Sequence, residues 1–85
     1  MKQFDFTVTD EQGIHARPAG LLIKEAKNFA SSVTVFKGDK SADMKKLLAL
    51  MGLGIKKGET ITVRVEGEDE EQAAAAIEKF LKETF

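Results

Sequence analysis

Two stretches of the 85-residue chain alternate apolar and polar residues, which is the pattern of a strand with one buried face. From Phe4 to Val8 every second residue is apolar, so we expect a strand over residues 2–8. The same alternation from Ile61 to Val65 predicts a later strand. In both strands the intervening polar residues should face water.

Two other stretches space their apolar residues by three and four, which predicts amphipathic helices. One helix is expected over residues 16–28. The other follows the acidic run EDEEQ, whose carboxylates suit the positive end of a helix dipole. The expected buried stripes are Ala19, Leu22, Ile23 and Ala26 in the first helix and Ala73, Ile77, Phe80 and Leu81 in the second.

The middle of the chain predicts three shorter elements. Strands over 32–37 and 40–43 are separated by a turn at Gly38, which is typical of a hairpin. A short helix over 46–52 follows and ends at a glycine. The complete order is βαββαβα. It predicts one α+β domain over residues 1–85, in which helices cover one face of a mainly antiparallel sheet.

The composition excludes several classes of protein. Cysteine is absent and histidine occurs once, so we expect no disulfide, no metal site and no cofactor. A chain without cysteine suits the cytoplasm. No apolar run approaches the ~20 residues of a membrane span, so membrane insertion is not expected.

Charge is distributed unevenly, although the net charge is only −1. Residues 11–58 hold nine Lys or Arg and four Asp or Glu, a local charge of +5, and the rest of the chain sums to −6. The basic region could meet an acidic partner, or both regions could be ordinary solvated faces. Nucleic acid is not an expected partner, because aromatic residues do not interleave with the basic ones.

The candidate chemistry lies in the stretch GIHARPAG, which contains the only histidine and the only proline. Pro18 has a fixed φ and no N–H, so it belongs in the first turn of a helix and places His15 at the helix start. The N–H groups there lack partners and the dipole is positive, a combination that binds phosphate. The Arg17 guanidinium would add a forked contact to phosphate oxygens.

An uncharged His15 imidazole is a competent nucleophile toward phosphorus, and the phosphoramidate would lie over the helix N–H groups and Arg17. A surface or capping role is the common alternative for a lone histidine. A Ser-His-Asp triad lacks a supporting motif, and a chain of this length leaves little room for a substrate pocket. A phosphate-handling site and a plain helix start therefore both remain open.

Over essentially its whole length the chain resembles the HPr family, the histidine-containing phosphocarrier proteins of the bacterial sugar phosphotransferase system. GIHARPA is similar to the family's active-site signature, MGLGIKKG to its second-helix segment, and GEDEEQAAAAIEKFL to its last helix. The resemblance implies an open-faced β-sandwich of four antiparallel strands with three helices. It also implies a stoichiometric phosphoryl carrier and not an enzyme.

The resemblance further implies a route for the phosphoryl group. His15 would accept it from enzyme I on Nδ1, as pros-phosphohistidine, and pass it to the A domain of a sugar-specific enzyme II. Arg17 would stabilise the transferred group and Pro18 would shape the helix start. At Lys46 the chain departs from many Gram-positive members, which carry a regulatory serine there, so that switch should be absent. Gly20 stands where the family often has alanine or threonine.

Apolar residues that the core does not need predict a docking surface beside the histidine. The short helix holds more leucines than one buried stripe requires, so at least two should be exposed, with lysines forming a basic rim. Alternatively, the leucines pack inward and the lysines only add solubility. The expected partner-binding residues are Ile14, Gly20, Lys24, Lys27, Lys45, Lys46, Leu47, Leu48 and Met51, with Leu21 a further candidate.

Two other functions stay open. A regulatory paralogue of the same family, in nitrogen-branch or catabolite control, would act through protein contacts alone; His15 argues against it, because such paralogues tend to lack the histidine. A regulatory domain that binds a small molecule would use GIHARPAG only as a helix start. We expect a monomer whose partners are enzyme I and the A domains of enzyme II.

Overall fold

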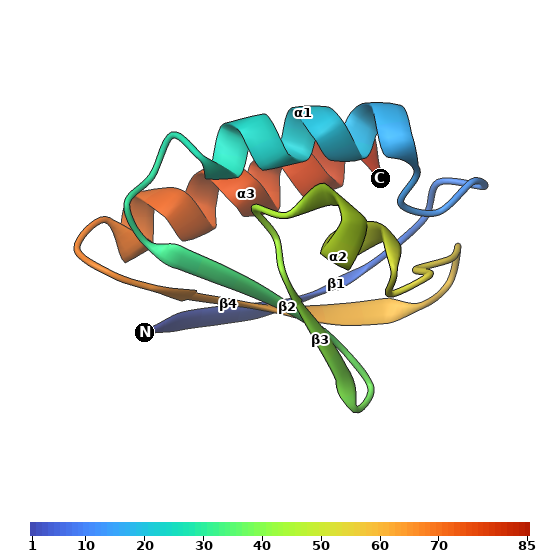
Figure 1. The fold of residues 1–85 in the computed structure, drawn as a ribbon, viewed down its shortest axis with the longest axis horizontal. Helices are drawn as coiled ribbons and strands as arrows, with labels where there is room; N and C mark the ends of the chain where they lie inside the picture. Colours follow the sequence, from blue (N-terminus) through green and yellow to red (C-terminus); the bar gives the residue numbers. More distant parts are fainter.

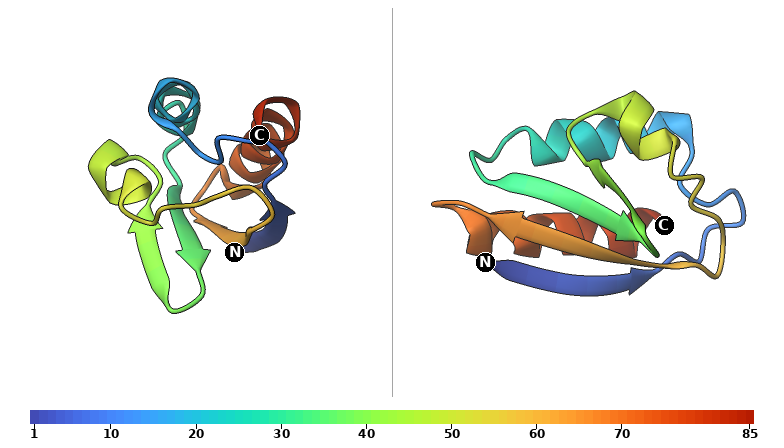
Figure 2. Two further views of the ribbon diagram at one scale, coloured as in Figure 1. Left: turned by 90° about the vertical axis from the view of Figure 1, so that its right-hand side faces the viewer. Right: turned by 60° about the horizontal axis from the view of Figure 1, so that its bottom comes forward.

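The computed structural model describes residues 1–85 and confirms the predicted order βαββαβα (Figure 1). The strands are β1 (Lys2–Thr7), β2 (Ser32–Lys37), β3 (Lys40–Asp43) and β4 (Thr60–Glu66). They form one sheet in the order β1-β4-β2-β3, and every neighbouring pair is antiparallel. The helices are α1 (Ala16–Ala26), α2 (Leu47–Met51) and α3 (Glu70–Thr84). All three lie on the same side of the sheet, as the end view in Figure 2 shows, so the predicted open-faced sandwich is confirmed.

The strand register explains why the sheet has one apolar and one polar face. Val63 of β4 lies opposite Phe4 of β1 and opposite Val35 of β2, so alternate residues of three strands build one continuous apolar face. The next residue along β4, Arg64, belongs to the other face, where its guanidinium lies 4.8 Å from the centre of the Phe36 ring. The helices therefore cover the apolar face, and the polar one meets water.

The helix stripes dock on that apolar face as predicted. The stripe of α1 is fully buried, and so are Ala73, Ile77 and Leu81 of α3. Phe80 is only partly buried and packs at the edge of the core. Phe85, four residues after Leu81, is buried and continues the stripe beyond the end of α3. None of the three helices has the length and apolar character needed to cross a membrane.

Helix α2 is short, and its ends are defined by the chain around it. Lys46 is its N-cap and Gly52 its C-cap, within one residue of the predicted bounds. Leu50 is the buried residue of the helix, and Leu53 and Ile55 just after it are buried too. The chain therefore leaves α2 through a segment anchored in the core.

Candidate functional site

Helix α1 begins at the place that Pro18 predicted, and His15 is its N-cap. The His15 backbone is extended, with φ −117° and ψ 167°, and its carbonyl accepts the Ala19 N–H at 2.9 Å. No hydrogen bond within the chain uses the N–H of Ala16 or Arg17, and Pro18 has none. The helix start thus presents two free donors and the positive end of its dipole beside the imidazole, which is the arrangement that binds anions.

The His15 ring is held on two sides and open on the others. Its side chain is 35% exposed, and Nε2 lies 3.8 Å from Asp10 Oδ1. The ring meets the Phe85 ring edge-on, with centroids 6.3 Å apart and planes at 86°. The Nε2 edge therefore faces a carboxylate, which in turn accepts the Gln12 N–H at 2.8 Å.

The loop before His15 is tied to the far end of the chain. The Phe85 main-chain oxygen accepts the N–H of Thr9 at 2.6 Å, the N–H of Asp10 at 2.8 Å and the Thr9 hydroxyl at 2.8 Å. Neither Asp10 nor Phe85 was predicted to belong to this site. A signal for Phe85 was present, because it continues the four-residue spacing of Ile77 and Leu81; Asp10 offered only its place in a short polar loop.

The same loop is seated against the segment that follows α2. The Ile14 N–H donates to the Ile55 carbonyl at 3.1 Å. Gly13, with φ +69°, packs so closely on Ile55 and Lys56 that a side-chain Cβ would overlap their backbone atoms. The short GIHARPAG motif is thus placed by a contact with chain more than 40 residues away in sequence.

The expectation that Ile14 belongs to an exposed docking surface is wrong. Its side chain is 6% exposed and lies in the core cluster. Side chains of consecutive residues in extended backbone point to opposite sides, so when His15 faces outward Ile14 faces inward. The sequence pattern showed an apolar residue beside the histidine but not the direction in which it points.

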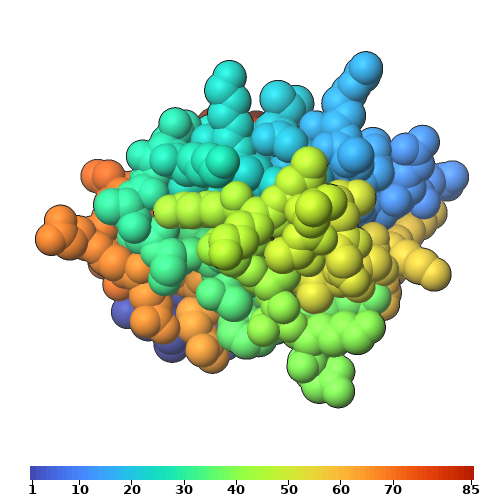
Figure 3. Space-filling view, in the orientation of Figure 1, coloured from blue at the N-terminus to red at the C-terminus, as the bar shows by residue number.

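The exposed apolar residues beside the site come from α1 and α2, which adjoin on one face of the molecule (Figure 3). Leu21 is 56% exposed, Leu47 41% and Leu48 88%, so the prediction that at least two leucines are exposed is confirmed. Leu50 is buried, and Met51 is only partly exposed because it packs against the core. We call Leu21, Leu47 and Leu48 the leucine patch.

Basic side chains surround the leucine patch, with one exception. Arg17, Lys24, Lys27 and Lys46 are exposed and their charged groups make no ion pair or hydrogen bond within the chain, and Gly20 between them is exposed as well. Lys45 was expected in the rim, but its ammonium donates to the carbonyls of Phe29 at 2.9 Å and Ser31 at 2.8 Å. It serves the loop between α1 and β2, whose carbonyls have no strand partner there.

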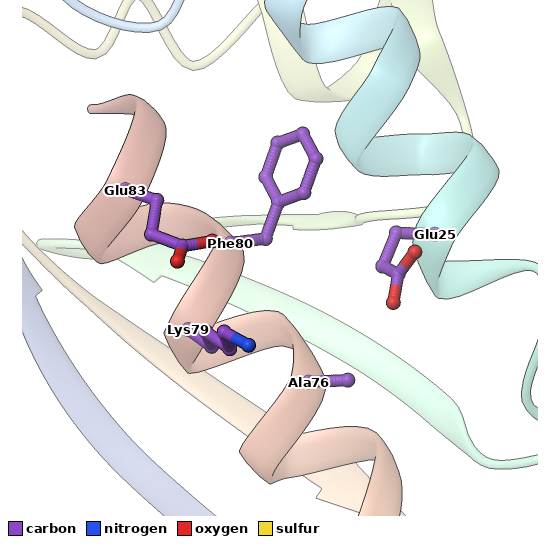
Figure 4. A pocket seen from close by; sticks show the side chains of 5 residues that line it. All are labelled: Glu25, Ala76, Lys79, Phe80 and Glu83. Atoms are coloured by element: carbon purple, nitrogen blue, oxygen red, sulfur yellow. The ribbon is translucent and has the colours of Figure 1, made fainter.

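A separate hollow of about 370 Å³ lies between α1 and α3 (Figure 4). The Phe80 ring extends from α3 toward α1, and the remaining lining residues are Glu25, Ala76, Lys79 and Glu83. It contains none of the predicted site residues. The hollow is the open seam between two helices.

The open-faced sandwich and the lone histidine at a helix start with two free N–H groups are the features expected of one class of protein, the small phosphoryl carriers. Residues 2–83 match the family described as "PTS HPr component phosphorylation site". The chain belongs to this HPr family, and it is a phosphocarrier of the bacterial phosphotransferase system, as the sequence resemblance implied.

The relatives agree over nearly the whole chain. The phosphocarrier protein HPr of Lysinibacillus sphaericus is 48% identical over 83 residues, which are 98% of this chain and 94% of the relative. The solved structure of the histidine-containing phosphocarrier protein of Mycoplasma superposes with a TM-score of 0.94 at 37% identity, covering 98% of this chain and 94% of that one. A second solved structure, the catabolite repression protein Crh of Bacillus subtilis, is described as a swapped, intertwined dimer. It has a TM-score of 0.79 at 34% identity, covering 98% and 95% of the two chains.

Proposed function

We propose that His15 is the phosphoryl acceptor and that the group bonds to Nδ1. The observation that carries the proposal is the His15 position at the start of α1, beside the free N–H groups of Ala16 and Arg17. Asp10 stands on the Nε2 edge of the ring, which leaves Nδ1 as the nitrogen for attack. Residues 1–85 act as one domain, with no catalytic turnover of their own.

In the transfer step the Nδ1 lone pair attacks phosphorus, and the bond between phosphorus and the donor histidine of enzyme I breaks. The phosphoryl oxygens then accept the N–H groups of Ala16 and Arg17 and the forked Arg17 guanidinium. Pro18 sets the φ that starts the helix and so aims these donors. Transfer to an A domain of enzyme II is the same exchange with a new acceptor.

The leucine patch and its basic rim are the surface on which both partners dock. An exposed apolar cluster beside a reactive group is a usual mark of a binding site. Exposed cations raise the rate of encounter with an acidic partner without requiring slow release. Arg17, Lys24, Lys27 and Lys46 have unpaired charges available for this purpose. Lys46 offers no hydroxyl to a serine kinase, so the carrier is constitutive.

We propose that the carrier acts as a monomer in the cytoplasm, where enzyme I and the A domains are found. The loop between β1 and α1 is closed onto the C-terminal residue of the same chain, which supports a single-chain fold. In this chain three hydrogen bonds from Thr9 and Asp10 to the Phe85 oxygen hold that loop. The carrier is favoured over a regulatory paralogue because His15 is present at an anion-binding helix start.

The test is incubation with phosphoenolpyruvate and enzyme I, followed by intact mass. The parent and a Ser41→Ala control should each gain one acid-labile, base-stable phosphoryl group, and His15→Ala should gain none. The His15→Ala free energy of unfolding should change by less than about 1 kcal/mol, because the ring is partly exposed and makes no capping hydrogen bond. Phosphorylation of His15→Ala, or an acid-stable product, would refute the assignment.

A kinetic comparison tests the Arg17 assignment separately. Arg17→Lys keeps the charge but loses the fork, so transfer should slow with Arg17→Lys and slow further with Arg17→Ala. Both variants should fold like the parent, since Arg17 is exposed and its guanidinium makes no hydrogen bond or ion pair within the chain. Parent-like rates for both, in both directions of transfer, would make Arg17 a bystander.

A further inference from the structure

Lys37, at the end of β2, reaches across to the segment that follows α2. Its ammonium donates to the Leu53 and Gly54 carbonyls, both at 3.0 Å, and pairs with Glu59 Oε1 at 3.1 Å. Three donors of one ammonium group thus meet three oxygens. Carbonyls just past a helix C-terminus lack intrahelical partners and lie at the negative end of the dipole, where a cation is favoured.

Glu59 completes the arrangement from the other end of the same segment. Its Oε1 accepts the Lys56 N–H at 2.7 Å. The hydrogen bond from the Lys56 N–H, followed by that from Lys37, lowers the pKa of the Glu59 carboxyl below its ordinary range. Lys37 and Glu59 therefore close a charged clasp around residues 53–56.

The segment inside this clasp is the one that supports the histidine loop. Ile55 offers its carbonyl to the Ile14 N–H at 3.1 Å, and Gly13 packs directly on the Ile55 and Lys56 backbone. A movement of residues 53–56 would therefore displace the backbone of Ile14, the neighbour of His15. The Lys37 ammonium forms no hydrogen bond or ion pair with His15, and Lys37 is absent from the GIHARPAG motif.

We propose that Lys37 and Glu59 are positioning residues for phosphoryl transfer, which act by clasping residues 53–56 and through them the backbone of Ile14 and His15. The proposal rests on the function proposed above for His15. Transfer needs the imidazole nitrogen in line with the phosphorus, and small displacements of a reacting group reduce its rate strongly. The clasp keeps the imidazole aligned by fixing the segment on which the His15 loop rests.

The decisive variants are Lys37→Met, which keeps the apolar stem without the ammonium, and Lys37→Arg, which restores donors and charge. Lys40→Met is the matched control, because the Lys40 ammonium is exposed and forms no hydrogen bond or ion pair. Amide hydrogen exchange at Ile14 reports on the clasp, and exchange at Val63 in central β4 reports on global opening. The maximal rate of enzyme I-dependent phosphorylation and the half-saturating carrier concentration are measured on the same samples.

Lys37→Met loses the two hydrogen bonds and the ion pair of the ammonium. Exchange at Ile14 should therefore rise by at least about tenfold relative to exchange at Val63, since the loss of one hydrogen bond to a charged group alone accounts for a change of that size. The maximal phosphorylation rate should fall while the half-saturating concentration stays near that of the parent. Lys37→Arg should restore both, and Lys40→Met should match the parent. Glu59→Gln, which keeps an acceptor for the Lys56 N–H, should show a smaller change of the same sign.

Unchanged exchange at Ile14 in both Lys37→Met and Glu59→Gln would overturn the proposal. So would a rise that Val63 shows in equal measure, because the residues would then support overall stability only. A parent protein that accepts no phosphoryl group would instead refute the proposed function of His15. The exchange measurement would still decide whether the clasp holds the loop.

Discussion

Asp69 shows how one side chain can join two distant parts of the chain. It is the N-cap of α3, yet its carboxylate accepts the Ser31 hydroxyl at 2.5 Å, the Ser31 N–H at 2.9 Å and the Ala30 N–H at 2.9 Å. The Ser31 hydroxyl, followed by the Ala30 N–H, lowers the pKa of Asp69 below its ordinary value of 3.8. The charged form of Asp69 therefore ties the start of β2 to the start of α3.

The lowered pKa of Asp69 predicts a loss of stability in acid. A carboxyl whose pKa is lower in the folded state stabilises fully above the unfolded pKa and loses this effect as the pH falls through the folded pKa. The free energy of unfolding should thus decrease when the pH is lowered below about 4. Asp69→Asn should flatten this dependence in part, since the pKa values of Glu59 and Glu70 are lowered too.

Urea unfolding at several pH values measures the effect. Asp39→Asn is the control, because Asp39 is exposed in the β2–β3 turn and its carboxylate forms no hydrogen bond or ion pair. If Asp69→Asn and Asp39→Asn change the pH dependence of the free energy of unfolding equally, the role of the Asp69 hydrogen bonds is contradicted.

At the scale of one element, the exposed face of α1 contains a glycine that weakens the helix and a leucine of the leucine patch. Its inward stripe is fully buried, while Gly20 and Leu21 face outward. A glycine inside a helix weakens it, because the unfolded chain has more conformational freedom to lose. Nothing lies within 4 Å of the place where a Gly20 Cβ would stand. Gly20 therefore weakens α1, and no close packing at this position requires a glycine.

Gly20→Ala should therefore raise the free energy of unfolding by about 0.5–1 kcal/mol. Gly13→Ala is the opposite case, because φ is +69° and the Ile55 carbonyl occupies the Cβ position; it should destabilise the protein. Denaturant midpoints of the two variants measure this contrast. A lower midpoint for Gly20→Ala would show that the outer face of α1 has a contact that the structure does not contain.

The short helix α2 has one face buried in the core and one exposed face that belongs to the proposed docking surface. Leu50 is 1% exposed and Leu48 is 88% exposed. Leu50→Ala should lower the free energy of unfolding by about 2–5 kcal/mol, because it leaves a cavity in the core. Leu48→Ala should change it by less than about 0.5 kcal/mol and should weaken the binding of enzyme I. Thermal unfolding and calorimetric titration distinguish the two, and equal effects of both variants on stability would contradict the assignment of faces.

At the scale of the whole molecule, charge and shape act together. The region of local charge +5 contains α1 and α2, which carry the leucine patch, and the acidic residues concentrate around α3 and its approach. All three helices lie on one side of the sheet (Figure 2), so the basic and the acidic regions both border the helical layer. If the proposed docking surface is correct, this distribution should orient an acidic partner toward His15 before contact.

A charge reversal at Lys46 tests the contribution of this charge distribution to the binding of enzyme I. The affinity for enzyme I should fall as salt rises, and Lys46→Glu should reduce it at low salt, where charges are least screened. Lys40→Glu changes the net charge equally but lies on β3, away from the leucine patch, and should have the smaller effect. Calorimetric titration at two ionic strengths measures all three proteins. Equal affinity of the parent and Lys46→Glu at low salt would place this position outside the docking surface.

Much of this protein could be predicted without coordinates, because the relevant information is local. Alternation and helical spacing indicated β1, β4, α1 and α3, since those periods follow from backbone geometry. The turn at Gly38 and the glycine after residue 51 indicated the shorter β2, β3 and α2. Pro18 indicated where α1 begins, because its missing N–H restricts it to a first turn. The prediction of phosphate chemistry at His15 and Arg17 was made from the same helix start, because a positive dipole end and free N–H groups are properties of any helix.

The remaining features depend on contacts between segments far apart in sequence. Burial of Ile14 depends on Ile55, and the ammonium of Lys45 is occupied by carbonyls of the α1–β2 loop. The clasp of Lys37 and Glu59 likewise joins residues from different elements. A periodic pattern reports which residues are apolar or charged, but the partner of each side chain is set when strands and helices pack. The local sequence therefore predicts His15 as the reactive group, whereas the contacts that hold the His15 loop in place arise from the fold.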